Sequence, residues 1–381
     1  MRWADGVIVG GGIAGLATAW ELARRGARVL LLEQEALLAS HSTARNAAIW
    51  LPTEIEGTSP ALTRRSAELL DELVGREGWL DPIGAVVTAS DAALLGTNAA
   101  GAAASGARVE SIDVETATRL APALSGGSTR AALYVPEAGV LDIHAMTDAV
   151  TRAARDAGVT IRTGVRVRRI VRDDPRTATG TSAHDGVVTD ARVTGVVLQD
   201  GTRIDAGLVV IAGGAWAGAL GASCGAPIAA TPLRRHLVIV EAEQAAREPV
   251  VWNVGKEVYY RPESGGLLAS PCDEDPIEAC TPPADGSQLD VLATRLTALA
   301  PALGGARVRR VWACLRTYTP DRELVAGPDP RAPGLAWLAG LGGRGMTIGL
   351  AAAELTAALV AGEESPFRDA VSPARASMRV A

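Results

Sequence analysis

Three glycines and one acidic residue near the start of the chain have the spacing of a dinucleotide-binding site. Gly10, Gly12 and Gly15 follow the apolar run 7–9, and Glu33 closes a second apolar run at 29–32. In this pattern the first glycine permits a tight turn, the second lets a pyrophosphate approach the backbone, and the third lets a helix lie close to the sheet. The helix N-terminus adds amide donors and a positive dipole. These residues predict the binding of a dinucleotide.

Glu33 narrows the chemistry of that site. A carboxylate at the tip of the second strand accepts hydrogen bonds from the two ribose hydroxyls of adenosine and repels a 2′-phosphate. FAD and NAD both carry such a ribose, so the fingerprint alone allows either. A glycine-rich turn without a ligand is the alternative, because the chain contains 42 glycines. The strand, the helix and the spaced acid are independent requirements, and together they favour a nucleotide.

The sequence patterns of the segments that must position these residues predict an α/β fold class with a Rossmann-like domain. The continuous apolar run 208–212 is typical of a buried parallel strand. Residues 335–339 predict another strand, a glycine-rich turn follows at 340–345, and 346–360 has the pattern of an alanine-rich helix. A second helix N-terminus is therefore expected to point into the sheet.

A second domain is expected because a chain of 381 residues is long enough for two packed cores. The β-type runs 234–240 and 258–262 predict a mostly antiparallel sheet for it, an α+β arrangement. The nucleotide signals fall in separate stretches, so the second domain lies between them. We predict a nucleotide-binding domain of residues 1–80, 140–225 and 320–381, and a substrate-binding domain of residues 81–139 and 226–319.

The composition argues against several classes of function. A formal net charge of −6, spread without blocks, argues against nucleic acid as a partner. The apolar runs are much shorter than a bilayer span, so no transmembrane segment is expected. The first strand begins by residue 7, which leaves no room for a signal peptide and predicts a cytoplasmic protein. The four cysteines lie too far apart for a CxxC pattern, and no metal site is expected.

Six motifs carry a family resemblance. They are the N-terminal fingerprint with Glu33, the segment 42–46, the run 210–216, the strand pair 260–266, the segment 316–321 and the glycine turn 340–347. Together they resemble the FAD-dependent D-amino acid oxidase and dehydrogenase family, which includes glycine oxidase and sarcosine oxidase, over essentially the whole chain. Within the family, the amino-acid sequences of segments 41–45 and 315–317 are most similar to those of D-arginine dehydrogenase and other D-amino acid dehydrogenases of broad substrate range.

The resemblance implies FAD as the cofactor, bound without a covalent bond as in the dehydrogenase relatives. It assigns the pyrophosphate to the glycine fingerprint, the adenosine ribose to Glu33 and the adenine to the backbone of Val167. It assigns the flavin ring to segment 42–47 and the pyrimidine end of the flavin to the turn 342–347. The implied cofactor-binding residues are Gly10, Gly12, Ile13, Ala14, Gly15, Glu33, Gln34, Ser42, Thr43, Arg45, Asn46, Ala47, Val167, Ala212, Gly213, Gly214, Trp216, Gly342, Gly343, Arg344, Gly345, Met346 and Thr347.

The C-terminal glycine turn has a physical reason to meet a flavin. A reduced flavin carries negative charge near N1 and the C2 carbonyl, and a helix N-terminus with free amides stabilises such a charge. The turn 342–345 leads into a helix, and Arg344 offers an added cation. The alternative for Arg344 is a solvated side chain in an ordinary strand-to-helix turn.

The reaction of the family implies what the substrate site has to do. In that reaction a hydride passes from the α-carbon of an amino acid to flavin N5. The protein then has to hold the amino acid and exclude water. A guanidinium binds a carboxylate well through two parallel hydrogen bonds. Arg316 stands at the position of the relatives' carboxylate-binding arginine, and Tyr260 stands where a tyrosine hydroxyl assists. Arg235 and His236 complete the candidate catalytic residues, with an outward-facing strand position as the alternative for both.

The implied activity is oxidation of the C–N bond of an amino acid, expected to be a D-amino acid, to an imino acid that hydrolyses to a 2-oxo acid and ammonia. Electrons would pass to a quinone, another carrier or oxygen. No lysine lies in the strand 267–270, where sarcosine oxidases carry an oxygen-activating lysine, which favours a dehydrogenase. Cys314 stands where sarcosine oxidases attach the flavin covalently, and an ordinary buried cysteine is the alternative.

Other activities stay open from the sequence. A 2-hydroxy acid dehydrogenase would use the same carboxylate clamp but needs a base for the hydroxyl proton, and His236 is the histidine available in the substrate domain. A sarcosine or glycine oxidase-type secondary amine oxidase would use the same residues. A flavoprotein without catalysis fits poorly with the intact Arg316 and Tyr260 positions. Ile49 and Trp50 replace the histidine and tyrosine of the D-arginine dehydrogenase relatives, so the same substrate is not expected.

Overall fold

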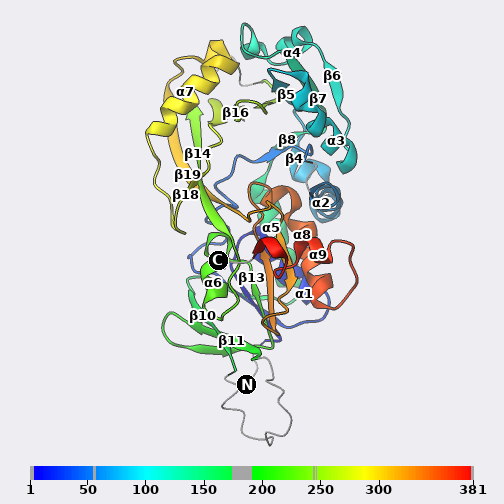
Figure 1. Ribbon diagram of the computed structural model, residues 1–381, viewed down its shortest axis with the longest axis vertical. Coiled ribbons are helices and arrows are strands. Elements are labelled where there is room, and N and C mark those ends of the chain that lie inside the picture. Colours follow the sequence, from blue (N-terminus) through cyan, green and yellow to red (C-terminus); the bar gives the residue numbers. More distant parts are fainter. Residues whose placement is uncertain (1–3, 55–56, 174–190, 243–244, 246, 379–381) are drawn as a thin grey trace, which may run out of the picture. The chain divides into compact units, whose positions relative to one another are not determined.

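The computed structural model describes residues 4–54, 57–173, 191–242, 245 and 247–378. The described residues form two compact units, whose elements are labelled in Figure 1. Unit 1 takes its residues from Met1–Ala44, Thr147–Pro232 and Thr317–Ala381, and unit 2 from Arg45–Met146 and Leu233–Arg316.

The elements of unit 1 alternate between strands and helices. They are β1 (Gly6–Val9), α1 (Ile13–Ala23), β2 (Val29–Leu32), most of α5 (Ile143–Asp156), β9 (Thr160–Arg162), β10 (Val167–Arg172), β11 (Val193–Leu198), β12 (Arg203–Asp205), β13 (Leu208–Ile211), α6 (Ala217–Ala222), β20 (Val325–Pro328), β21 (Leu335–Ala339), α8 (Gly345–Val360) and α9 (Arg368–Val371).

Unit 1 is built on a six-stranded sheet in the order β20-β21-β13-β1-β2-β9. Its strands are parallel, except that β20 runs antiparallel to β21. The central strands β1, β2 and β13 read GVIV, VLLL and LVVI and are almost entirely buried, as strands covered on both faces usually are. This confirms the predicted Rossmann-like α/β domain.

Two layers cover the parallel sheet. On one face, a core that includes Val7, Val9, Val209 and Ile211 packs against the antiparallel sheet β10-β11-β12. Side chains alternate along a strand, so the fully buried Ile8 points to the other face. Helix α1 contacts β1, β2 and β21, α8 contacts β20 and β21, and the two helices pack on each other. The sheet therefore places the N-termini of both helices at the carboxyl ends of parallel strands.

The elements of unit 2 are mostly strands. They are β3 (Ile49–Trp50), α2 (Ser59–Val74), β4 (Leu80–Asp81), β5 (Ala85–Ala89), α3 (Gly96–Ser105), β6 (Glu110–Ile112), α4 (Val114–Leu120), β7 (Ala131–Val135), β8 (Gly139–Leu141), most of β14 (Thr231–Val240), β15 (Val250–Asn253), β16 (Val258–Glu263), β17 (Gly266–Ser270), β18 (Asp275–Pro276), α7 (Ser287–Leu299) and most of β19 (Val308–Tyr318).

The main sheet of unit 2 has the order β18-β14-β17-β16-β15-β5-β7-β6, and β19 pairs with β14. Strand β14 runs antiparallel to β17 and β18, β16 to β15 and β17, and β7 to β5 and β6, whereas β15 and β5 are parallel. The predicted mostly antiparallel sheet is confirmed. One face packs against α4 and α7, the latter yellow in Figure 1. The opposite face carries a second core of Leu237, Tyr259, Leu268, Cys272 and Cys314, together with Ala47. We call this second face the site face.

The predicted domain limit at residue 80 differs from the division into units. Residues 45–80 fall within unit 2, because β3 and β4 both pair with β8, and α2 packs on α3. These partners come much later in the chain, so the local pattern of residues 45–80 did not reveal them. The other predicted limits lie three to seven residues from the unit boundaries.

No helix in the described part of the chain combines the length and the apolar character that crossing a bilayer requires.

Candidate active site

The glycine turn after β1 has no space for a side chain at two of the three fingerprint glycines. Gly10 has a φ of 117°, and a Cβ there would lie 2.4 Å from the carbonyl oxygen of Ala212. A Cβ on Gly15 would lie 1.8 Å from the Gly10 carbonyl oxygen, so α1 touches the turn directly. Gly12 has ordinary backbone angles, and its Cβ would lie 3.1 Å from the Thr43 hydroxyl. Gly10 and Gly15 are therefore required by the fold, whereas Gly12 keeps the start of the helix open.

Glu33 lies against this turn. Its buried carboxylate accepts hydrogen bonds from the backbone N–H of Gly11 at 2.5 Å and of Glu35 at 2.8 Å. The N–H of Val165 donates to the Glu33 carbonyl at 2.8 Å, which places the segment leading to Val167 beside the same strand end. Two amide donors thus hold the carboxylate at the end of β2, where the fingerprint predicts it.

The N-terminus of α8 lies beside the N-terminus of α1. A Cβ on Gly345 would lie 4.0 Å from the Ile13 side chain, and a Cβ on Gly349 would lie 3.4 Å from it. The turn before α8 requires glycine at Gly342, because φ is 55° and a Cβ would approach the Tyr318 ring to 2.3 Å. Two positive helix ends therefore meet at one edge of the sheet, where they can stabilise anionic groups.

Arg344 immediately precedes α8 and is buried. One guanidinium nitrogen donates to the Arg322 carbonyl oxygen at 2.5 Å. The side chain is therefore held by the protein, and the alternative of a solvated arginine does not apply.

The loop after β2 covers the start of α1. The Thr43 hydroxyl accepts a hydrogen bond from the Ile13 N–H at 3.1 Å. The His41 ring lies 4.7 Å from the Trp216 ring between centroids, and its Nε2 lies 2.9 Å from a carboxylate oxygen of Glu35. These contacts join the loop to the end of β13.

The fold thus brings the predicted cofactor residues of unit 1 to one edge of its parallel sheet, the edge at which open α/β sheets bind ligands. The remaining three, Arg45, Asn46 and Ala47, belong to unit 2. The residues at the edge follow β1, β2, β9, β13 and β21, and they are Gly10, Gly12, Ile13, Ala14, Gly15, Glu33, Gln34, Ser42, Thr43, Val167, Ala212, Gly213, Gly214, Trp216, Gly342, Gly343, Arg344, Gly345, Met346 and Thr347.

Arg316 occupies the site face of unit 2 near the end of β19. It is 6% exposed, and its Nη1 donates to the Cys314 sulfur at 3.0 Å and to the Leu315 carbonyl oxygen at 3.2 Å. No carboxylate within the described residues forms an ion pair with it. A buried guanidinium without an anion is unfavourable unless a ligand supplies the negative charge.

Tyr260, predicted to assist Arg316, points to the opposite face. It is fully buried beside α7, and its hydroxyl donates to Glu248 at 2.8 Å. Its neighbour Tyr259 lies on the site face, close enough for electrostatic interaction with Arg316 and Arg235. Tyr259, and not Tyr260, therefore shares the face of Arg316. Strand alternation shows that the two rings diverge, but only the packing decides which one shares a face with Arg316.

Both ring nitrogens of His236 have partners within the protein. The residue is fully buried, its Nδ1 lies 2.6 Å from an Asp273 carboxylate oxygen, and its Nε2 accepts the Asp285 N–H at 2.8 Å. Burial raises the pKa of Asp273, but the hydrogen bonds from His236 outweigh this and hold it below its usual value. Both ring nitrogens therefore have partners, and neither is available to take a proton from a substrate.

Arg235 lies near Tyr259 and Cys272 but is paired. Its Nε donates to the Asp273 carbonyl oxygen at 2.8 Å, and its Nη2 donates to Glu274 at 3.0 Å. A third buried arginine, Arg261, was missed by the sequence reasoning. It follows Tyr260 by one residue and so shares the face of Tyr259, a signal that strand alternation contained.

Arg261 ties the segment after β2 to the sheet. Its Nε donates to the Ala47 carbonyl oxygen at 2.5 Å, and its Nη2 donates to Glu263 at 3.0 Å. The indole N–H of Trp312 donates to the Arg45 carbonyl oxygen at 3.2 Å. Segment 45–47, predicted to line the flavin, is thus fastened to the site face by its backbone.

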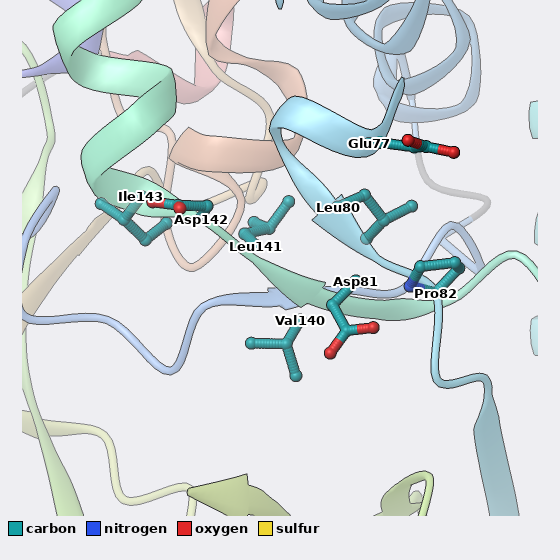
Figure 2. Close-up of a pocket in the computed structure, with 8 residues that line it drawn as sticks. All are labelled: Glu77, Leu80, Asp81, Pro82, Val140, Leu141, Asp142 and Ile143. Atoms are coloured by element: carbon teal, nitrogen blue, oxygen red, sulfur yellow. The ribbon is translucent and has the colours of Figure 1, made fainter. Parts of the chain in front are cut away.

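A hollow elsewhere in unit 2 contains none of the predicted site residues. Figure 2 shows Asp81 and Asp142 among the residues that surround it. Its lining comes from β4, β8 and the segments next to them, namely Glu77, Leu80, Asp81, Pro82, Val140, Leu141, Asp142 and Ile143.

The sequence model of the family described as FAD dependent oxidoreductase matches residues 5–359. The chain belongs to this family. FAD is therefore the cofactor, and NAD, which the fingerprint alone allowed, is excluded. The glycine turn without space for side chains, the fixed carboxylate of Glu33 and the paired helix termini fit this dinucleotide.

Several individual proteins resemble most of the chain. Glycine oxidase from Geobacillus kaustophilus is 27% identical over 375 residues, covering 95% of this chain and 94% of the relative. The mitochondrial pyruvate dehydrogenase phosphatase regulatory subunit of Mus musculus is 24% identical over 365 residues, but the chain spans only 40% of its length. The crystal structure of L-proline dehydrogenase from P. horikoshii has a TM-score of 0.82 at 24% identity, covering 98% of this chain and 97% of that one. This likeness supports the fold.

Proposed function

We propose that this enzyme oxidises the C–N bond of an amino acid whose carboxylate binds Arg316. The observation that carries the proposal is the buried guanidinium, which has no carboxylate partner in the described part of the chain. A substrate carboxylate would supply the missing anion through two charge-assisted hydrogen bonds. Relatives and neighbours named glycine oxidase, sarcosine dehydrogenase and L-amino acid deaminase support an amino acid as the substrate class.

Tyr259 would act as a neutral hydrogen-bond donor beside Arg316. Burial raises the pKa of Tyr259 to about 12, so its hydroxyl keeps its proton at neutral pH. A protonated phenol donates to a carboxylate without adding charge. The arginine and the tyrosine would together orient the substrate for the reaction.

The edge of unit 1 would hold the cofactor. The glycine turn and the N-terminus of α1 would bind the pyrophosphate, and Glu33 would bind the adenosine ribose. The N-terminus of α8, with Arg344 before it, would stabilise negative charge at the pyrimidine end of the flavin. When bound, FAD accepts the hydride that leaves the α-carbon. Attachment is proposed to be non-covalent, because the Cys314 thiol is 1% exposed and contacts Arg316.

The contacts of His236 do not favour a 2-hydroxy acid as the substrate. Oxidation of an alcohol needs a base for the hydroxyl proton. His236 was the candidate for that role, and its two nitrogens are occupied by Asp273 and the Asp285 N–H. An amine can lose its proton to water before the α-hydrogen leaves, so C–N oxidation has no such requirement.

We propose an uncharged substrate side chain. Glu274 and Glu263, two carboxylates that flank the site face, pair with Arg235 and Arg261. Neither is available to recognise a basic side chain. The D configuration stays a prediction from the sequence, since structural neighbours named L-proline dehydrogenase and L-amino acid deaminase act on L-amino acids.

We propose a quinone or another carrier as the electron acceptor. Strand β17 reads GLLAS and has no lysine, the residue that the family resemblance associates with oxygen activation in this strand. Turnover with a dye acceptor is therefore expected to exceed turnover with oxygen.

Anaerobic mixing with a panel of substrates tests the proposed function. We expect at least one neutral α-amino acid to bleach the flavin absorbance near ~450 nm, with the D and L forms tested separately. Glycine, sarcosine, proline, arginine and matching 2-hydroxy acids complete the panel. If 2-hydroxy acids bleach the flavin and no amino or imino acid does, the proposal is wrong.

Two phenylalanine variants separate the neighbouring tyrosines. Tyr259→Phe should raise KM about 10- to 100-fold, the value of one hydrogen bond to a charged group. Tyr260→Phe should leave KM unchanged and lower the free energy of unfolding by about 1–3 kcal/mol, because the buried Glu248 loses the Tyr260 hydroxyl and keeps only the Ala123 N–H as a donor. Steady-state kinetics and urea unfolding measure the two effects. A KM effect confined to Tyr260→Phe would reverse the assignment.

A further inference from the structure

Within the described residues, the hydrogen-bond acceptors of Arg316 lie on its own strand. Residues two apart on a strand point to the same face, so Cys314 and Arg316 lie side by side on β19. The Cys314 sulfur accepts from Nη1 at 3.0 Å, and the backbone carbonyl of Leu315 accepts from the same nitrogen at 3.2 Å. Both acceptors are uncharged groups.

The Cys314 sulfur is held in a fixed place. Its residue is 1% exposed and belongs to the core of the site face with Leu237, Tyr259 and Leu268. Its S–H is directed to the Arg235 carbonyl oxygen on β14 at 3.6 Å, and β14 is the partner of β19 in the sheet. With the S–H turned to β14, a sulfur lone pair is left for the guanidinium.

The three buried arginines of the site face differ in their partners. Arg235 pairs with Glu274 at 3.0 Å, and Arg261 pairs with Glu263 at 3.0 Å. Arg316 has instead the Cys314 thiol, whose S–H is directed to the Arg235 carbonyl oxygen and whose sulfur is a weak acceptor. A weak neutral partner orients a guanidinium without neutralising it, so the positive charge stays available to a ligand.

We propose that Cys314 is a positioning residue that holds Arg316 in place and leaves its charge unpaired for the substrate carboxylate. The inference rests on the proposed role of Arg316 in binding that carboxylate. It gives position 314 a specific requirement: the side chain must be a small, uncharged acceptor. An acidic side chain there would form the ion pair that the substrate has to form.

A matched pair of variants isolates the charge at position 314. Cys314→Asp and Cys314→Asn have nearly the same size, and only the first carries a carboxylate. We expect Cys314→Asp to raise KM at least about tenfold and to change kcat less than about threefold, because the internal carboxylate competes with the substrate before the chemical step. Cys314→Asn and Cys314→Ser should keep KM within about threefold of the wild type, because both retain an uncharged acceptor.

A binding measurement supports the kinetic one. The dissociation constant of the 2-oxo acid product, measured by titration calorimetry on the FAD-loaded enzyme, should rise in Cys314→Asp in proportion to KM. Cys280→Ser serves as the cysteine control, since Cys280 is partly exposed and lies outside the core of the site face. FAD content and melting temperature are compared for every variant. If Cys314→Asp does not fold, the KM of Cys314→Ala is compared with the KM of Cys314→Ser. In that case the alanine variant should raise KM about threefold to tenfold and serine should restore it.

The outcomes distinguish the two proposals. If Arg316→Ala raises KM but Cys314→Asp and Cys314→Ala leave KM and the product affinity unchanged, Cys314 does not position Arg316. If Arg316→Ala itself leaves KM unchanged, the carboxylate clamp is wrong and the role of Cys314 is wrong with it. An equal rise of KM in Cys314→Asp and Cys314→Asn would show a packing effect rather than a charge effect and would also overturn the inference.

Discussion

Replacing Arg316 with alanine is expected to raise KM for the amino acid substrate by about 10²- to 10³-fold. Two charge-assisted hydrogen bonds in a buried site contribute about 3–4 kcal/mol, and alanine removes both of them. Arg316→Lys keeps the charge but cannot form the parallel pair, so an intermediate rise of about tenfold is expected. Steady-state kinetics over a wide substrate range measures KM and kcat separately.

Arg309→Ala is the matched control for this experiment. Arg309 lies on the same strand β19, but it is exposed and donates to the Gly265 carbonyl oxygen. Its removal is expected to leave KM within about twofold, as is usual for surface substitutions. A wild-type KM in Arg316→Ala, with FAD content and folding intact, would exclude Arg316 as the carboxylate ligand.

Substituting Gly15 with alanine is expected to give a protein without bound FAD. The added Cβ would lie 1.8 Å from the Gly10 carbonyl oxygen, so α1 and the turn have to move apart. That movement displaces the helix N-terminus proposed to bind the pyrophosphate. We expect FAD to be lost on gel filtration, together with a loss of about 3 kcal/mol or more in the free energy of unfolding.

Gly12→Ala and Gly218→Ala separate loss of the cofactor from loss of the fold. Gly12 has ordinary backbone angles, and its Cβ would meet only the Thr43 hydroxyl, at 3.1 Å. Gly12→Ala should therefore fold and bind FAD about 10- to 100-fold more weakly, because the methyl group occupies the approach to the amides. Gly218→Ala has neighbours no closer than 3.8 Å and should retain FAD. Full FAD occupancy in Gly15→Ala would contradict the proposed site.

The predicted strands and helices rested on local sequence patterns, and the structure agrees with them. The run from β1 through the turn to α1 is specified by apolar strand residues, by glycines that require a positive φ or close contact, and by helix periodicity. Each of these signals acts between residues a few positions apart. The Rossmann-like class and the mostly antiparallel sheet could be predicted for this reason.

The faces of the site strands could not be predicted in the same way. A slip of one residue moves every side chain of a strand to the other face, and the sequence of β16 offers a tyrosine for each. The packing of Tyr260 with Glu248, and of Tyr259 with the core around Leu237, makes the choice. The family resemblance suggested Tyr260, whereas the packing places Tyr259 on the face of Arg316, which is why we propose Tyr259 instead.

The sequence by itself predicted a dinucleotide at the first turn, and its family resemblance pointed to Arg316 as the residue for a carboxylate. Only the tertiary structure decided which charges are free. His236 is occupied by Asp273 and Asp285, Arg235 is paired with Glu274, and Arg316 is left with Cys314. The physical reason is that an ionisable group becomes available or unavailable through its partners, and in a folded chain most of these partners come from other segments.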